Sequence, residues 1–454
     1  MKHRIIALFA GLLAWTAFPS DALAQSEGYY QEIVAEGRIH VFSSEKKYQA
    51  YTESKDMGVA ITRPGYGPNG ETVVFEDAKA IEAFNKKYGL VEPPPKEVKA
   101  DDVKLPFDVK WRAPGLRFTF PKFELNWSNR IQIQATQENP ETTAGQADRL
   151  SFRIRRLRLK LDGWACTKDL TYEVQVSLHE TGTATSNMLE DANVDYDLTK
   201  GKKAFRLKAG QYKVPFGRQE LTSSGSQQFV DRSIVSAEFA RGRDIGVQLW
   251  GQLGPEAVPD LLEWRVGAFN GAGRSVTRNT NDKLQYNGRV TFSPWGGADY
   301  SESHLEQFPN PRLSVAVNFE DRDKVIRPAT GAPSGDDRET IGADVSFKWG
   351  PLSVFGEGFQ QDRTSPAGAT TEWEGIHGQV GVFVVPQKLE VAGRYAELDP
   401  NRDVGDNERV ETGVALNWFW SRHNHKLQFD ARNVENKAAN ADDKEYRLQY
   451  QLIF

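Results

Sequence analysis

The chain has 454 residues, of which 26% are charged, and its formal net charge at pH 7 is −5. This length admits two or three soluble domains or one large barrel. The mildly acidic balance gives no sign of a nucleic-acid partner. Cys166 is the single cysteine, which excludes an intrachain disulfide and a cysteine-rich metal site.

Residues 1–24 have the pattern of a cleaved signal peptide. A basic start precedes an almost wholly apolar stretch over 5–18, and residues 22–24 (Ala-Leu-Ala) offer the small-x-small pattern that signal peptidase accepts. No cysteine follows this site to accept a lipid. Past this segment no apolar run is long enough to cross a bilayer as a helix. The sequence therefore predicts an exported protein.

Residues 25–90 mix short strand and helix patterns, which predicts a small α+β module. The run Val-Glu-Pro-Pro-Pro-Lys opens residues 91–116, which we interpret as a Pro-rich linker. Two roles stay open for the module, a folded extension without a separate activity and a docking or plug element. The strands are expected over 38–42, 59–62 and 72–75, and the helices over 44–51 and 77–88.

Residues 117–454 change to two-residue alternation, in which one face of each segment is apolar and the other is polar or charged. Sixteen such segments can be counted, and an even number is what a closed antiparallel barrel with both ends on one side requires. The segment near Leu352 is the weakest, because Gly356 and Gly358 blur its faces. The segments begin near Phe123, Phe152, Leu170, Ala192, Phe205, Ile245, Leu262, Leu284, Leu313, Ile341, Leu352, Ile376, Leu389, Val410, Leu427 and Tyr446.

The links between these segments are sorted by length, usually tight after every second strand and longer between. The longest covers residues 213–243, and an unstructured loop of that size inside a compact protein is unusual. Tight turns on one side and long loops on the other are typical of outer-membrane barrels. We therefore predict an all-β fold, a 16-stranded antiparallel transmembrane β-barrel in the outer membrane of a Gram-negative bacterium, with the α+β module in the periplasm.

The opposite assignment is a secreted all-β protein whose two sheets bury their apolar faces against each other. The polar faces are uniformly large and charged, which favours a barrel whose apolar face meets lipid of the outer membrane. Phe454 ends the last alternating strand in phase with its apolar face. It resembles the terminal aromatic residue that the barrel assembly machinery recognises, so we expect that machinery as a partner.

The second strand carries the strongest charge signal. Its two apolar sets, Phe152/Ile154 and Leu157/Leu159/Leu161, are out of phase by one residue, so a bulge near residues 155–156 is needed to keep both outward. Lipid does not accept a row of cations, so these side chains are expected to face a solvated channel. The cations are Arg153, Arg155, Arg156, Arg158 and Lys160.

The same phase turns further charges toward the lumen, and acids share that face. One interpretation is that the charges keep the pore wet and balance each other. The other is that a positive stripe, together with cations of the long loop, draws anions through a narrowed zone. The further inward cations include Arg130, Arg206, Lys208, Arg265 and Arg289, and those of the loop and its ends are Lys213, Arg218, Arg232, Arg241 and Arg243.

Three segments of this chain resemble the phosphate-selective porin O and P family. They are the arginine-rich segment 153–163, the segment 207–217 (Leu-Lys-Ala-Gly-Gln-Tyr-Lys-Val-Pro-Phe-Gly) and the segment 241–246 (Arg-Gly-Arg-Asp-Ile-Gly). The resemblance spans roughly residues 117–454 and is most specific over 208–246.

This resemblance implies a sixteen-stranded barrel, a homotrimer, and a third loop bent into the pore. It also implies that arginines at Arg155 and Arg156 stabilise phosphate near the constriction, with lysines from the long loop assisting. Around the loop's Thr-Ser-Ser, where phosphate-selective members place lysines, this chain has Gln219, Glu220 and Gly225. We therefore expect a preference for small inorganic anions such as phosphate rather than strict phosphate selectivity.

Two other functions compete with this one. A general-diffusion or organic-acid channel would use the same barrel, and sequence separates it poorly from an inorganic-anion pore. An outer-membrane barrel enzyme would need a nucleophile and a base at matched depth. His179 has no obvious serine partner, and His423 and His425 lie in a tight turn, where we expect solvated side chains. No catalytic motif is found, so we predict no enzyme, no metal and no cofactor.

Overall fold

The computed structural model describes residues 29–91, 107–112, 114–141, 147–178, 188–276, 278–279, 281–297, 299–323, 325 and 334–454. The predicted signal peptide and His179 lie outside these residues. The chain divides into two compact units, Met1–Lys104 and Leu105–Phe454. No helix in the described part of the chain is long and apolar enough to cross a membrane.

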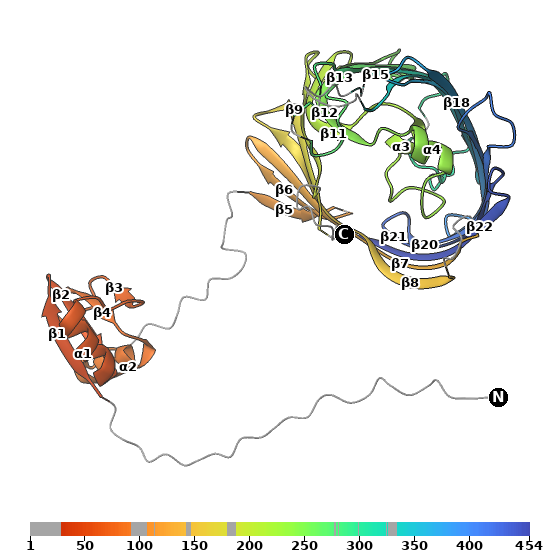
Figure 1. Cartoon of the computed structure of the whole chain (residues 1–454). Helices are drawn as coiled ribbons and strands as arrows, with labels where there is room; N and C mark the ends of the chain where they lie inside the picture. The colour runs from red at the N-terminus through yellow and green to blue at the C-terminus, as the bar shows by residue number, and fades with distance from the viewer. Residues whose placement is uncertain are drawn as a thin grey trace, which may run out of the picture. The chain divides into compact units, whose positions relative to one another are not determined.

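The first unit is the predicted α+β module (Figure 1). Its four-stranded sheet has the order β1-β2-β4-β3, with β2 and β4 parallel. Alternate strand residues face opposite sides, and one helix packs on each side, α2 against Val73 and Phe75 and α1 against Phe42 and Val74. The elements are β1 (Gln31–Ala35), β2 (Arg38–Phe42), α1 (Glu45–Ser54), β3 (Ile61–Arg63), β4 (Thr72–Phe75) and α2 (Ala78–Tyr88).

The second unit is a closed antiparallel barrel (Figure 1). Within the described residues sixteen strands, β7 to β22, each pair with the next, and β22 pairs with β7 to close the ring. They are β7 (Phe123–Asn139), β8 (Arg149–Ala165), β9 (Thr167–Ser177), β10 (Leu189–Asp197), β11 (Arg206–Lys213), β12 (Arg243–Leu253), β13 (Leu262–Phe269), β14 (Gln285–Phe292), β15 (Arg312–Asp323), β16 (Asp337–Trp349), β17 (Leu352–Thr364), β18 (Thr370–Val385), β19 (Leu389–Asp399), β20 (Arg409–Ser421), β21 (His425–Asn436) and β22 (Ala441–Ile453).

Each predicted strand start lies within one of these strands or next to its first residue. The weakest prediction, near Leu352, corresponds to β17, which pairs along its whole length with β16 and β18. The fold class predicted from the alternation is therefore confirmed. Because the strands form one closed ring, the alternative of two sheets packed over a dry core is wrong.

The linker prediction extends too far toward the barrel. The strands β5 (Asp108–Trp111) and β6 (Leu116–Phe120) pair as an antiparallel hairpin, and β6 pairs with the first residues of β7. The physical reason lies at the seam of the ring. β22 pairs with β7 only from Arg130 onward, so the hairpin covers the edge that the start of β7 would otherwise expose.

The two faces of each strand meet different surroundings. On β15, Val317 and Phe319 are 59% and 47% exposed on the outside, whereas Asn318 and Glu320 are at most 3% exposed on the inside. This is the reverse of a soluble protein, in which apolar side chains are the buried ones. An apolar outer surface over a polar interior is what a barrel in a lipid bilayer requires.

The predicted bulge in the second strand is present in β8. Gln132 of β7 lies opposite Arg156, and the next residue, Ile133, lies opposite Ile154, so Arg155 is the extra residue. Ile154 is 54% exposed on the outer face, and Arg156 is 5% exposed on the inner face. The bulge therefore keeps both apolar sets of this strand outward.

Deleting Arg155 is expected to preserve the barrel, because Ile154 and Arg156 would then alternate without the extra residue. Deleting Arg158 instead shifts the alternation by one residue between Leu157 and Lys160. The residues on one side of the deletion would then change face, and each cation turned toward lipid would cost roughly 2–4 kcal/mol. Electrophoresis of unheated and heated samples checks both variants. Loss of the heat-modifiable band in the Arg155 deletion, or its full retention in the Arg158 deletion, would contradict the assignment of the bulge.

Candidate functional site

The long loop between β11 and β12 lies inside the barrel (Figure 1). We call residues 214–242 the inner loop; it contains α3 (Arg218–Leu221) and α4 (Ile234–Phe239). Backbone N–H groups of the loop donate to carboxylates on the far wall, Val230 to Asp430 of β21 at 2.8 Å and Ile234 to Glu411 of β20 at 2.7 Å. The predicted inward loop therefore crosses the lumen.

The inner loop packs one of its sides tightly against the wall. Phe216 and Phe239 stack on Phe359 of β17, with ring centroids 5.4 and 5.1 Å apart, and Val235 is fully buried in the same cluster. Gln228 adds a polar tie, since its amide donates to Glu390 of β19 at 2.7 Å. This packing leaves the β17–β21 side of the lumen filled, and the open space lies on the opposite side.

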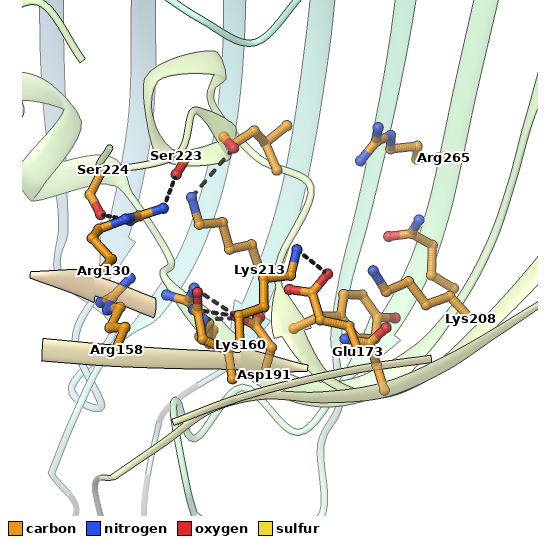
Figure 2. Close-up of a pocket in the computed structure, with 16 residues that line it drawn as sticks. Arg130, Arg158, Lys160, Glu173, Asp191, Lys208, Lys213, Ser223, Ser224 and Arg265 are labelled. Carbon is orange, nitrogen blue, oxygen red and sulfur yellow. Dashed lines mark hydrogen bonds and ion pairs between the residues drawn. The ribbon is translucent and has the colours of Figure 1, made fainter. Parts of the chain in front are cut away.

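A cavity of about 280 Å³ lies on that opposite side, between the inner loop and strands β7 to β13 (Figure 2). Among the described residues, seven cations and two carboxylates line it, so we call it the cationic chamber. The cations are Arg130, Arg158, Lys160, Lys208, Lys213, Arg243 and Arg265, and the carboxylates are Glu173 and Asp191.

Carboxylates hold several of these cations in place. Arg243 makes a bidentate pair with Asp191 at 3.0 and 2.8 Å, and Lys160 lies 3.1 Å from Glu173. Glu190, fully buried behind the chamber, pairs with Arg158 and again with Arg243. Paired and hydrogen-bonded charges keep fixed positions, so these pairs order the chamber while reducing its net field.

Three chamber cations make no ion pair within the described residues, and one of them, Lys213, is held instead by backbone carbonyls of the inner loop. Within the described residues, Lys208 makes no ion pair, and its Nζ lies 4.7 Å from the ring centre of Tyr212. Arg130 donates to the hydroxyls of Ser223 and Ser224, both at 3.0 Å, and has no carboxylate partner among the described residues. Besides Lys213, an oxyanion in the chamber therefore meets one ammonium and one guanidinium that have no carboxylate at contact distance in the part of the chain that the structure describes.

The guanidinium of Arg130 lies beside Gly225 of the inner loop. A Cβ at Gly225 would lie 2.9 Å from the guanidinium carbon of Arg130, so this guanidinium occupies the space beside the loop. At this place the loop residue is uncharged, and the cation beside it comes from the barrel wall.

Arg155 and Arg156 lie outside the chamber and bind a carboxylate of the protein itself. Asp231 of the inner loop lies 2.9 Å from Arg155 and 3.6 Å from Arg156, and Arg447 of β22 approaches it to 3.5 Å. These two arginines, which the sequence predicted to stabilise phosphate, therefore bind an anionic group, but that group is the side chain of Asp231 in the inner loop.

The remaining candidate residues mostly anchor the loop or its ends. Lys213 donates to three backbone carbonyls, those of residues 220, 221 and 222, although it also borders the chamber. Arg232 pairs with Glu220 at 2.9 Å, and Arg241 pairs with the buried Glu320. Of the others, Arg153 donates to Gln134, Arg206 pairs with Asp195, and the guanidinium of Arg218 lies over the ring of Tyr300.

Of the twelve candidates, the structure thus brings five to the chamber: Arg158, Lys160, Lys208, Lys213 and Arg243. Arg130 and Arg265 were expected to face inward but were not among the candidates. The pairing register of β7 and β8 could have pointed to Arg130, because this residue lies directly opposite the candidate Arg158.

One contact bears on the enzyme alternative. Ser301 Oγ and His423 Nε2 are 2.8 Å apart, a distance typical of a nucleophile and its base. His423 Nδ1 is buried and has no hydrogen-bond partner in the described part of the chain, so no acid orients the ring. The side chain of His423 is half-buried, with one ring nitrogen on Ser301 and the ring against Phe419, so it is only partly open to solvent.

A closed sixteen-stranded barrel with an apolar exterior, an inward loop and a charged lumen defines the class of outer-membrane porins. The family model described as phosphate-selective porin O and P matches residues 126–454, well over half of the sequence. The chain therefore belongs to the phosphate-selective porin O and P family.

Similar proteins agree with this fold. An uncharacterized protein of Aquifex aeolicus is 21% identical over 355 residues, covering 67% of this chain and 81% of that protein. The anion-selective porin from Comamonas acidovorans matches with a TM-score of 0.52 and 14% identity, over 73% of this chain and 100% of that one. The outer membrane channel DcaP of Acinetobacter baumannii matches with a TM-score of 0.51 and 14% identity, over 74% and 99%.

Replacing Asp231 with Asn is expected to raise the preference for anions, because Arg155, Arg156 and Arg447 would lose one shared negative charge. Asp231 is 21% exposed, so the change reaches the lumen. A unit charge about 7 Å from a passing ion in water is worth roughly 0.6 kcal/mol, or roughly a threefold change in local anion concentration.

The measurement is the chloride-over-potassium permeability ratio from reversal potentials in planar bilayers. Asp403→Asn, at an exposed position between β19 and β20, makes the same charge change as a control. Equal ratios in the Asp231 variant and the wild type would contradict the interpretation that Asp231 offsets the charge of its arginine partners.

Proposed function

We propose that this porin passes small anions, phosphate and other oxyanions among them, by diffusion through the cationic chamber. The single observation that carries the proposal is the excess of seven cations over two carboxylates in a cavity beside the inner loop. Lys208 and Arg130, without ion pairs in the described residues, supply the attraction. The familial relationship supports a channel, and the chamber supports the sign of its charge preference.

The arrangement suits conduction as well as attraction. A site that binds an anion too tightly would block the pore, so binding must be favourable enough to admit the ion and weak enough to release it. Glu173 and Asp191 lower the net field of the chamber, and their ion pairs keep its arginine and lysine side chains from collapsing onto a bound anion. We infer that they promote release.

A general-diffusion or organic-acid channel is the second candidate. A second cavity of about 290 Å³ is lined by Asp260, Glu263 and Asp299 as well as Arg218, so the lumen is not uniformly positive. Gln219 and Glu220 also stand where phosphate-selective relatives are expected to carry lysines. These residues favour a broad preference for anions over a narrow one for phosphate.

The cellular arrangement that we propose is a homotrimer in the outer membrane, with the α+β module on the periplasmic side. The trimer is what the family relationship favours, and the module precedes the barrel in the chain. We infer no separate activity for the module, whose buried residues form its own small core.

The proposal is tested on the purified wild-type protein in planar bilayers under a KCl gradient. We expect a reversal potential of the sign that chloride permeation gives. Adding phosphate at constant chloride should then reduce the chloride current if phosphate enters the same chamber. A potential of the potassium sign would overturn the proposal, and an anion-selective current that phosphate leaves unchanged would support the general-diffusion alternative.

Lys208→Glu should reverse much of this preference, because it replaces a chamber ammonium that has no ion pair in the described residues with a carboxylate. Two charge units at about 7 Å in water predict roughly a sevenfold fall in local chloride concentration and a similar rise in local potassium, so the chloride-over-potassium ratio should fall by more than roughly sevenfold at low salt. Lys202→Glu is the matched control, since Lys202 is exposed in the turn between β10 and β11. The role of Lys208 would be refuted by equal ratios in these two variants.

A further inference from the structure

The link between β14 and β15 differs from the other links at its end of the barrel. Of its neighbours at that end, the turn between β16 and β17 has two residues and the link between β12 and β13 has eight. This link is much longer, and in its middle Glu302, Ser303, His304 and Leu305 are at most 5% exposed. We call residues 299–308 the inner link, because burial of this degree places its middle inside the mouth of the barrel.

The outer side of the inner link is fixed to the short turns. Ser301 Oγ lies 2.8 Å from His423 Nε2 of the turn between β20 and β21. The carbonyl of Phe308 accepts from the backbone N–H of Gly350 at 3.1 Å. Ser303 donates to Glu390 of β19 at 2.7 Å. The link is therefore seated on the wall rather than projecting away from it.

The inner side of the link is fixed to the inner loop through Glu302. Its carboxylate accepts from the backbone N–H of Gln228 at 2.8 Å, from the Gln219 amide at 3.0 Å and from the Gln379 amide of β18 at 2.9 Å. Its own backbone N–H donates to the carbonyl of Ser226 at 3.0 Å. A buried carboxylate that loses such donors carries a large desolvation penalty, so Glu302 attaches the link firmly to the loop.

The tip of the link reaches the edge of the cationic chamber. The ring of Tyr300 lies 4.7 Å from the guanidinium carbon of Arg218 in the inner loop and 5.9 Å from that of Arg265. Arg265 lines the chamber, and Tyr300 lines the second cavity of about 290 Å³. Tyr300 therefore stands at the boundary between the two cavities.

We propose that the inner link is a second constriction of this channel, which closes the lumen beneath the inner loop and leaves solutes the passage beside Tyr300 and Arg265. Tyr300 sets the width of this passage, and Glu302 holds the link in position. The proposal needs a conducting barrel but does not depend on the proposed preference for anions.

The experiment measures single-channel conductance and the size limit for neutral sugars, the latter by liposome swelling, on the full-length protein. Glu302→Ala should release the link from the inner loop. We expect roughly a doubling of conductance and entry of larger sugars, since a wider pore offers less resistance. Glu306→Ala is the matched control, because Glu306 lies in the same link but pairs at the surface with Arg422, where both side chains are about half exposed.

Tyr300→Ala is the second variant and leaves the hydrogen bonds of Glu302 in place. It should widen the passage by shortening the tip of the link. If the Glu302 variant lacks the heat-modifiable band of a folded barrel, the conductance of the Tyr300 variant tests whether the link constricts the channel. Folded variants with wild-type conductance and size limit would overturn the proposal, as would an equal rise in Glu306→Ala. A wild-type reversal potential of the potassium sign would refute the anion preference and leave this result standing.

Discussion

The structure depends on one constraint, that a closed sheet in lipid must turn its polar side chains inward. In a soluble protein a buried polar or charged group is an exception that needs a partner. Here such groups form the interior, with Glu320, Lys426 and Gln449 all fully buried. The barrel can hold them only because they bind one another, the inner loop or water. The inner loop thus completes the hydrogen bonding of the wall that surrounds it.

This constraint divides the cations of the lumen into two groups. Most arginines that face inward are engaged in holding protein to protein, as Arg155 and Arg156 hold Asp231. A smaller group, with Lys208 and Arg130 as its clearest members, faces an open cavity. Selectivity in such a channel follows from the second group, so counting inward charges overstates the field that a passing ion meets.

Sequence reasoning predicted the parts of the structure that follow from local periodicity. The sixteen strands and the bulge at Arg155 are consequences of which neighbours alternate, and a slip in that alternation is visible in the chain itself. The hairpin of β5 and β6 was missed because these strands are too short for periodicity to stand out after a proline run. The role of Arg155 was not predictable in the same way, because its partner Asp231 lies 76 residues away. Likewise, Glu302 gives no local sign that it meets three distant amides.

The meeting of the inner loop with the inner link at Glu302 has a mechanical consequence. The loop enters from the end with long connections and the link from the end with short turns, so hydrogen bonds run through the lumen from one mouth to the other. A force applied to the loop at the outer face is transmitted through the hydrogen bonds of Glu302 and Ser301 to the turn that holds His423. The two mouths of the barrel are therefore braced against each other through the interior as well as through the wall.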